Sequence, residues 1–300
     1  MAKKVIVTGC GGMLGSSVYK VLKAKNYEVL ATDIDLNEEW LSCLDVRDFE
    51  KAEKIAKEFM PEAIIHLAAL TSLEYCEKNP EEAYKTNYIG TRNMALICKE
   101  LDIPLIYVTT VGVFDGEKYT YADNDLPNPI NVYGKTKLYG EIAVEHLLKK
   151  YFIARAGWMM GGGKKDKKFV SYIYSQIKKG NRVFNVVNDK FGIPTYTEDF
   201  ARNIEILINT ELYGKYNLGC SGEASRAEIA KFILYTLNAK DVVINEVSSE
   251  FFQKDFPVKR ITSERMINSK QDHPSFSFIM RDWKVCLKEY LENMEKEFQK

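Results

Sequence analysis

"VIVTGCGGMLGSSV", residues 5–18, is an apolar strand pattern that runs through three glycines, spaced three residues apart, into an amphipathic helix. Glycine at these positions allows a tight turn, and it lets backbone N–H groups and the helix N-terminus approach a pyrophosphate without an intervening side chain. The spacing is one residue looser than G-x-G-x-x-G, so the signal depends on the strand before it and the helix after it. The residues expected to line this site are Gly9, Gly12, Met13, Leu14 and Gly15.

The first half of the chain repeats this alternation of strand and helix. Short β-branched runs at residues 28–33, 63–69 and 105–110 are separated by longer helical patterns. Such alternation is typical of right-handed βαβ units and a parallel sheet. We therefore predict an α/β fold with a doubly wound parallel sheet of the Rossmann type.

The second half predicts a smaller α/β lobe built from segments that leave and rejoin the sheet. Strand patterns at residues 150–155 and 214–219 enclose helical insertions at 168–180 and 198–210. The mixture of glycine and lysine at 161–168 predicts a mobile loop. The expected division is a Rossmann domain at 1–155, rejoined by about 195–220, and a smaller substrate-binding lobe at 156–194 and 221–300.

Asp33 stands at the end of the second predicted strand, eighteen residues after Gly15. A carboxylate at this point of a Rossmann fold accepts hydrogen bonds from an adenosine ribose. The segment 33–40, "DIDLNEEW", contains no arginine or lysine, so a 2′-phosphate would meet only acidic side chains there. The pattern favours NADH, with NADPH as the second choice, and a strand-end turn is the alternative role for Asp33. Asp45 and Val46, after a short connector, are expected to cover the adenine.

A second polar group lies farther along the chain. Thr110 ends the strand pattern at 105–110, and parallel-sheet ligands bind beyond the carboxyl ends of strands. Tyr133 and Lys137 lie four apart at the start of the next predicted helix. The three residues supply a hydroxyl to polarise a carbonyl, a phenol to give it a proton and an ammonium to lower the pKa of that phenol. The alternative is a solvated Tyr–Lys pair on an open helix face.

The same predicted helix has a stripe that is expected to pack against the core and contains Tyr139, Ile142, Ala143 and His146.

The composition argues against several classes of protein. Of the 300 residues 46% are hydrophobic, which is ample for a buried core, and the 42 basic and 42 acidic residues cancel. No overall field therefore favours nucleic acid or an anionic membrane. No apolar run approaches the ~18 residues of a membrane span, so we predict a cytoplasmic location. The six cysteines form no Cys-x-x-Cys pair and the three histidines are far apart, so we expect no metal site.

These motifs match a family pattern. The chain resembles the extended short-chain dehydrogenase/reductases, whose signature is G-x-x-G-x-x-G with Ser/Thr and Tyr-x-x-x-Lys, and more narrowly the dTDP-4-dehydrorhamnose reductases. The resemblance covers most of the chain, including "VFDG" (113–116), "NVYGKTKLYGE" (131–141) and "GIPTYTEDFARNI" (192–204). It implies an NAD(P)-dependent oxidoreductase with the catalytic triad Thr110, Tyr133 and Lys137. The further cofactor contacts that it implies are Leu67, Ala68, Ala69 and Asn87, together with Tyr133 and Lys137 of the triad, and the implied substrate contacts are Thr71, Val111 and Trp158.

The chain departs from this family at two places. Val111 and Gly112 replace an Asp-Tyr pair that faces the sugar in those reductases, and an Arg-Pro before "NSK" is replaced within 258–270. The resemblance implies reduction of a keto group on a nucleotide-activated deoxysugar. The alternatives are a nucleotide-sugar 4-epimerase that uses the same triad and a non-catalytic NAD(P)-binding regulatory subunit. The expected partner is the nucleotide sugar, and a homodimer is left open.

A few other residues have competing interpretations. His66, at the end of a buried strand, is expected to be a hydrogen-bonded core histidine rather than a catalytic one. Arg155 or Arg265 could hold a pyrophosphate, and a lone arginine is otherwise a surface ion-pair partner. Trp158 either covers the nicotinamide or fills the core between the lobes.

Overall fold

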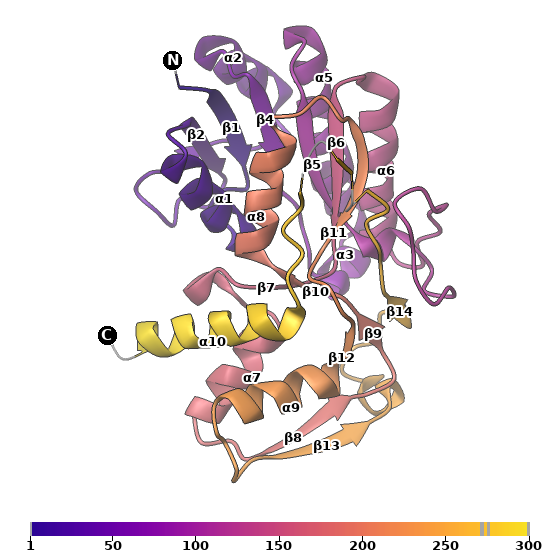
Figure 1. Cartoon of the computed structure of the whole chain (residues 1–300). Coiled ribbons are helices and arrows are strands. Elements are labelled where there is room, and N and C mark those ends of the chain that lie inside the picture. Colours follow the sequence, from indigo (N-terminus) through magenta and orange to yellow (C-terminus); the bar gives the residue numbers. More distant parts are fainter. Residues whose placement is uncertain (1, 271–272, 275–276, 299–300) are drawn as a thin grey trace.

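Within residues 2–270, 273–274 and 277–298, which the computed structural model describes, seven strands form one parallel sheet at the centre of the larger lobe (Figure 1). Their order is β11-β6-β5-β4-β1-β2-β3, and every neighbouring pair is parallel. The strands are β1 (Lys4–Thr8), β2 (Glu28–Asp33), β3 (Ser42–Cys43), β4 (Ala63–His66), β5 (Leu105–Thr110), β6 (Tyr151–Ala156) and β11 (Gly214–Leu218). The strand order reverses between β1 and β4, where doubly wound folds bind ligands. The predicted Rossmann-type fold is confirmed.

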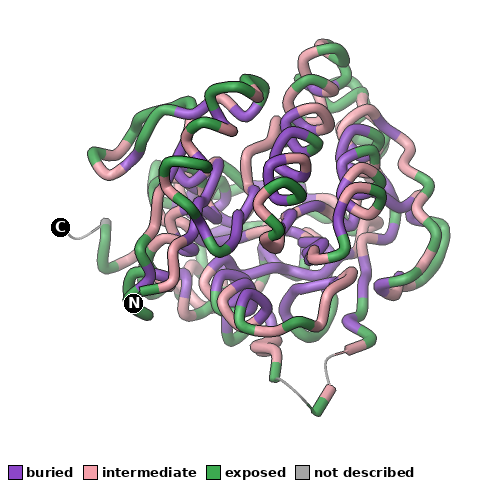
Figure 2. The backbone as a smooth tube through the Cα atoms, turned by 90° about the horizontal axis from the view of Figure 1, so that it is seen from above, coloured by how far each residue is buried: buried purple, intermediate pink, exposed green. Residues whose placement is uncertain are grey.

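Helices cover both faces of this sheet because its strands are apolar on both sides. On one face lie α1 (Met13–Ala24) and α8 (Thr197–Leu207), and on the other lie α2 (Phe49–Phe59), α5 (Gly90–Leu101) and α6 (Val132–Leu147). Val5 and Val7 of β1 belong to the first core, whereas Ile6 belongs to the second. Seen from above, the buried residues follow the strands and the inner sides of the helices (Figure 2). The short α3 (Leu73–Lys78), α4 (Pro80–Tyr84) and π-helical η1 (Lys85–Ile89) lead into α5.

The smaller lobe lies below the sheet in Figure 1. Its helices are α7 (Phe169–Lys178), α9 (Arg226–Thr236) and α10 (Trp283–Phe298). Its strand pairs are β7 (Trp158–Met160) with β10 (Pro194–Tyr196), β8 (Val183–Val187) with β13 (Val243–Val247), and β9 (Phe191–Gly192) with both β12 (Ala224–Ser225) and β14 (Ser263–Glu264). Ile173, Ile233 and Leu287 belong to its separate core. The chain returns to the sheet through α8 and β11, and the domain boundaries inferred from the sequence stay a prediction.

The packing face predicted for α6 is wrong. Tyr139 and Ile142 are 46% and 38% exposed, and the buried side of the helix contains Lys137, Gly140 and Glu141 instead. Gly140 allows this orientation because a Cβ at that position would collide with the hydroxyl of Tyr107 on β5. Polar side chains can face the core here because each finds a partner, as the active-site geometry below shows.

The glycine–lysine segment, residues 161–168, which the sequence predicts to be a mobile loop, is connected to the C-terminal helix. It contains the short helix η3 (Gly163–Lys165). The buried carboxylate of Asp166 accepts hydrogen bonds from the Tyr290 hydroxyl at 2.9 Å and from the backbone N–H of Lys168 at 2.7 Å. These bonds connect the segment to the C-terminal helix, and its mobility stays a prediction.

No helix in the part of the chain that the structure describes is long and apolar enough to cross a membrane. Among the same residues no group of three or more His, Cys, Asp or Glu side chains is placed to hold a metal ion.

Candidate active site

The three motif glycines, two in the loop after β1 and one in the first turn of α1, have different surroundings. Gly9 has a φ of +67°, and a Cβ built on it would lie 2.5 Å from the backbone nitrogen of Ala68. A Cβ on Gly15 would collide with the backbone of Cys10. A Cβ on Gly12 would meet only the Gly9 carbonyl oxygen, at 3.3 Å. Gly9 and Gly15 are therefore required by packing, whereas Gly12 faces space that a ligand can enter.

The N-terminus of α1 is open at Gly12. This residue is the N-cap in an extended conformation, no hydrogen bond from its side chain is possible, and the first turn carries no acidic residue. The first N–H groups of a helix have no partner within it, and its N-terminus carries a partial positive charge. The backbone of Met13, Leu14 and Gly15 therefore fits the pyrophosphate of a dinucleotide.

Asp33 at the end of β2 touches the glycine loop directly. Its Oδ2 accepts a hydrogen bond from the N–H of Gly11 at 2.9 Å, and its Oδ1 accepts one from the N–H of Asp35 at 3.1 Å. The second bond is the strand-end turn considered from the sequence, and the first ties Asp33 to the pyrophosphate loop. The strand-end turn is therefore present, and the contact of Asp33 with an adenosine ribose stays a prediction.

Asp45 and Val46 lie after β3, on the far side of the acidic segment. The Asp45 carboxylate is paired with Arg47 at 2.7 Å, and this guanidinium holds the pKa of Asp45 below its usual value. Val46 is buried, and its Cγ2 would lie 2.7 Å from a Cβ on Gly90 of α5. Their proposed contact with adenine stays a prediction.

Three predicted cofactor contacts follow β4, across the reversal of strand order from the glycine loop that follows β1. Leu67, Ala68 and Ala69 are half-buried, and the Leu67 N–H continues the β1 pairing by donating to the Thr8 carbonyl at 3.0 Å. Asn87 is fully buried, so it acts through its neighbours. Its side chain accepts from the Leu70 N–H at 2.7 Å and donates to the Leu70 carbonyl at 2.9 Å.

Asn87 also donates to the Thr136 hydroxyl at 3.0 Å, which ties the loop after β4 to α6.

His66, beneath this loop, is a core histidine as expected. It contacts the hydroxyls of Thr8 and Thr91 at 2.7 and 3.0 Å, and burial lowers its pKa to about 3, so it stays neutral.

Thr110 and Tyr133 meet at the carboxyl end of β5. Asn131 starts α6 by accepting a hydrogen bond from the Gly134 N–H at 2.9 Å, which places Tyr133 in the first turn. A Cβ on Gly112 would lie 3.3 Å from Thr110 Oγ1 and 3.9 Å from Tyr133 Cε1. Burial raises the pKa of Tyr133, and the neighbouring Thr110 side chain partly offsets this rise.

Lys137 lies one helical turn below Tyr133 and is only 3% exposed. Its Nζ donates to the Val108 carbonyl at 2.9 Å and stands 4.3 Å from the centre of the Tyr107 ring. Burial lowers its pKa to about 7, and the charge of Glu141 partly offsets this. A solvated Tyr–Lys pair is therefore excluded, because the lysine is inside the protein.

Two charged residues that sequence reasoning missed lie near the predicted substrate contact Trp158 and near Tyr133. The Arg226 guanidinium lies 3.7 Å from the centre of the Trp158 ring, and Trp158 is buried in the core of the smaller lobe. Glu264 of β14 is close enough for its charge to affect the pKa of Tyr133, and burial raises the pKa of this carboxyl. No local motif marks Arg226 or Glu264, because both reach the site only when the lobes pack together.

The other two predicted substrate residues have different surroundings. The Thr71 hydroxyl is exposed and lies 3.5 Å from Nζ of Lys168, so the glycine–lysine segment also reaches this end of the site. Val111 is fully buried in a small cluster with Phe114, Ile193 and Met266.

A family model described as the RmlD substrate binding domain matches residues 3–296. The chain belongs to this family. The spore coat polysaccharide biosynthesis protein SpsK of Bacillus subtilis (strain 168) is 30% identical over 291 residues, which are 96% of this chain and 97% of that protein. The dTDP-4-dehydrorhamnose reductase of Mycolicibacterium smegmatis is 27% identical over 96% of this chain and 85% of its own length.

Solved structures agree. The crystal structure of the dTDP-4-dehydrorhamnose reductase from Bacillus anthracis str. Ames in complex with NADP is 32% identical, covers 98% of this chain and all of that one, and has a TM-score of 0.89. The predicted resemblance is confirmed, and this member of the RmlD family is an NAD(P)-dependent oxidoreductase of the extended short-chain dehydrogenase/reductase type.

Two arginines considered for pyrophosphate binding have other partners in this RmlD-type chain. Arg155 is fully buried in an ion pair with Glu141. Arg265 is paired with Glu223 at 2.8 Å and lies between the rings of Tyr119 and Phe191, 4.3 and 4.2 Å from their centres. Neither is a free surface cation.

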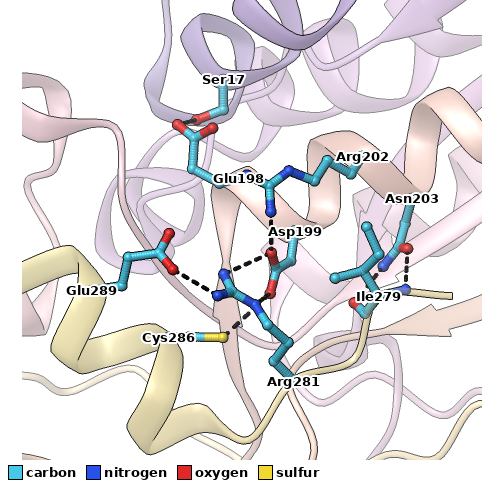
Figure 3. Close-up of polar contacts among 9 residues, drawn as sticks. All are labelled: Ser17, Glu198, Asp199, Arg202, Asn203, Ile279, Arg281, Cys286 and Glu289. Carbon is cyan, nitrogen blue, oxygen red and sulfur yellow. Dashed lines mark hydrogen bonds and ion pairs between the residues drawn. The ribbon is translucent and has the colours of Figure 1, made fainter.

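Helix α8 connects the glycine-loop helix to the C-terminal helix of the RmlD-type fold (Figure 3). Ser17 of α1 donates to Glu198 at 3.1 Å. The next residue, Asp199, accepts from Nε and Nη2 of Arg281 at 2.8 and 2.9 Å, and Arg281 in turn donates to Glu289 of α10 at 2.6 Å. This network fixes the smaller lobe against the helix that would hold the pyrophosphate.

Proposed function

We propose that this protein reduces a keto group on a nucleotide-activated deoxysugar. The observation that carries the proposal is that Thr110 and Tyr133 both border Gly112 at the end of β5, with the buried Lys137 one helical turn after Tyr133. Named relatives of similar length are dTDP-4-dehydrorhamnose reductases. A carbonyl substrate placed above these residues would be reduced to an alcohol.

The protein's part in this reaction is to orient the substrate and move one proton. A bound nicotinamide dinucleotide supplies the hydride. Tyr133 gives its phenolic proton to the carbonyl oxygen, and the Thr110 hydroxyl orients that oxygen. Lys137 supports the phenol from below, and its nearby charge favours the phenolate that remains after proton transfer.

The cofactor proposal is that NADH binds more tightly than NADPH. Asp33 is placed beside the glycine loop, and the neighbouring Asp35, Glu38 and Glu39 would repel an additional phosphate. The relative from Bacillus anthracis was crystallised with NADP, so acceptance of both cofactors is the expectation. Titration calorimetry with each dinucleotide tests the order, and tighter binding of NADPH would contradict it.

We expect the nucleotide sugar to bind on the side of the site that the smaller lobe forms. Arg226 offers a guanidinium, which suits the diphosphate of a nucleotide sugar, and the indole of Trp158 offers an apolar face. Thr71 and Val111 are the other proposed contacts. The homodimer and the cytoplasmic location inferred from the sequence stay predictions.

The deciding experiment is a screen of 4-keto nucleotide sugars for oxidation of NADH, repeated with two phenylalanine variants. Tyr133→Phe removes the proton donor and should lower turnover by about 10²–10⁴-fold while NADH affinity stays unchanged. Tyr139→Phe, on the exposed face of the same helix, is the matched control and should leave turnover intact.

The two alternatives give different results in the same screen. A 4-epimerase would cause no net oxidation of NADH with these 4-keto sugars, whereas with NAD+ and a 4-hydroxy nucleotide sugar it would invert carbon 4, which NMR detects. A regulatory subunit would bind the dinucleotide but turn over none of the sugars, and this result would refute the proposed reductase.

A further inference from the structure

A cation from the smaller lobe, Lys165, reaches the acidic segment that follows β2. Its Nζ lies 3.0 Å from Oε1 of Glu38 and 3.3 Å from Oδ1 of Asn37, and 5.5 Å from the centre of the Trp40 ring. Its side chain is 21% exposed, so the ammonium is held in place yet open to a ligand. The segment 33–40, which has no basic residue of its own, therefore acquires one through the tertiary fold.

Lys165 is connected to the proposed dinucleotide site by short polar contacts. Asn37 donates to the Gly11 carbonyl at 3.3 Å, and the Gly11 N–H donates to Asp33 at 2.9 Å. Asp33 and Lys165 also act in opposite directions on the thiol of Cys10, whose pKa burial raises to about 12. Lys165 thus lies beside the carboxylate expected to bind the adenosine ribose.

The backbone of the glycine–lysine segment fixes this lysine from both sides. On one side, Gly162 packs so closely on the glycine loop that a Cβ there would lie 2.7 Å from the Met13 carbonyl oxygen. On the other side, the buried Asp166 is bound by Tyr290. Because both flanks are anchored, the ammonium needs little further ordering to bind a ligand.

We propose that Lys165 binds the 2′-phosphate of NADPH and is the residue that allows this acidic site to accept that cofactor. The inference rests on the proposed use of a nicotinamide dinucleotide. In a Rossmann fold the 2′ position of the adenosine lies at the end of the second strand, where an arginine or lysine compensates a 2′-phosphate. Lys165 has three N–H donors, and two are shared with Glu38 and Asn37. A phosphate therefore takes the third and competes with Glu38 for the charge.

Titration calorimetry of NADPH and NADH against the whole protein tests this assignment. Lys165→Met should weaken NADPH binding by about tenfold and change NADH binding by less than about twofold, because NADH has no 2′-phosphate. Lys164→Met is the matched control, since Lys164 is the preceding residue of η3 and is exposed. It should leave the ratio of the two dissociation constants unchanged.

A second variant tests the competition from Glu38. Glu38→Gln removes the charge that holds Lys165, so NADPH affinity should rise severalfold more than NADH affinity. The NADPH dissociation constant of the wild type should also depend more steeply on salt than that of Lys165→Met.

The outcomes separate this inference from the proposed function. If Lys165→Met and Lys164→Met both keep the wild-type ratio of NADPH to NADH affinity, Lys165 does not bind the 2′-phosphate and the inference is overturned. If the wild type binds neither dinucleotide, both the cofactor proposal and this inference are overturned.

Discussion

Arg155 and Glu141 form a completely buried bidentate ion pair beneath the proposed active site. Nε of Arg155 lies 3.0 Å from Oε1 of Glu141, and Nη2 lies 2.6 Å from Oε2. The third donor of the guanidinium, Nη1, binds the Asp123 carbonyl at 2.8 Å. Since Glu141 follows Lys137 by one turn of α6 and Arg155 lies on β6, the pair fixes the catalytic helix to the sheet.

Removing one member of this pair should destabilise the protein strongly. Glu141→Ala leaves the Arg155 guanidinium buried without a counter-charge, so the free energy of unfolding should fall by about 3–5 kcal/mol. Urea denaturation measures this loss. The double variant Arg155→Met, Glu141→Leu should recover much of the stability, because it leaves no unpaired charge. Glu292→Ala, on the exposed side of α10, is the control, and an equal loss there would contradict the assignment.

Lys137 should make stability depend on pH in a predictable direction. Its pKa in the folded state is about 7, below the usual lysine value of 10.5, so between these values the unfolded chain binds more protons than the folded one. Stability must therefore rise with pH in this window. Relative to Lys137→Met, the wild type should gain about 2 kcal/mol between pH 7 and 9. Urea midpoints at both pH values test this, and parallel pH profiles for the two proteins would show that Lys137 keeps an ordinary pKa.

Two glycines of the same loop should respond differently to substitution. Gly12→Val puts a branched side chain into the space proposed for the pyrophosphate, where only one protein atom stands close, so it should abolish dinucleotide binding while the thermal midpoint changes little. Gly15→Ala should instead lower the thermal midpoint, because its Cβ collides with the Cys10 backbone. Calorimetry and thermal unfolding of both variants distinguish the roles. Normal NADH affinity in folded Gly12→Val would mean that the loop only serves the fold.

Asn87 should act as a positioning residue. Asn87→Ala removes its bonds to Leu70 and to the Thr136 hydroxyl, which connect the loop after β4 to the helix that carries Tyr133. Stability should fall by about 1–3 kcal/mol, and turnover should fall more than NADH affinity because the phenol is displaced. Steady-state kinetics beside calorimetry measure this split. Equal losses in turnover and cofactor affinity would instead indicate a direct role in holding the dinucleotide.

The sequence alone determined the fold class and the chemistry of the site, because both are encoded in short segments. Alternating strand and helix patterns predict a parallel sheet whatever the later packing, and the conformations of Gly9 and Gly12 follow from a turn of a few residues. The roles of Thr110, Tyr133 and Lys137 are inferred from their places at a strand end and a helix start and stay predictions, and both Thr110 and Tyr133 border Gly112 in the structure.

The tertiary structure alone decided the surroundings of these residues, because burial and charge depend on elements far apart in the chain. The helical stripe chosen for the core of α6 was wrong, since Gly140 lets the helix turn its polar side toward Tyr107. Lys137 is buried for the same reason. Lys165 reaches Glu38 only because the smaller lobe folds back over the glycine loop. No local pattern can report such contacts, since the energy of a charge is set by neighbours that only the folded chain brings together.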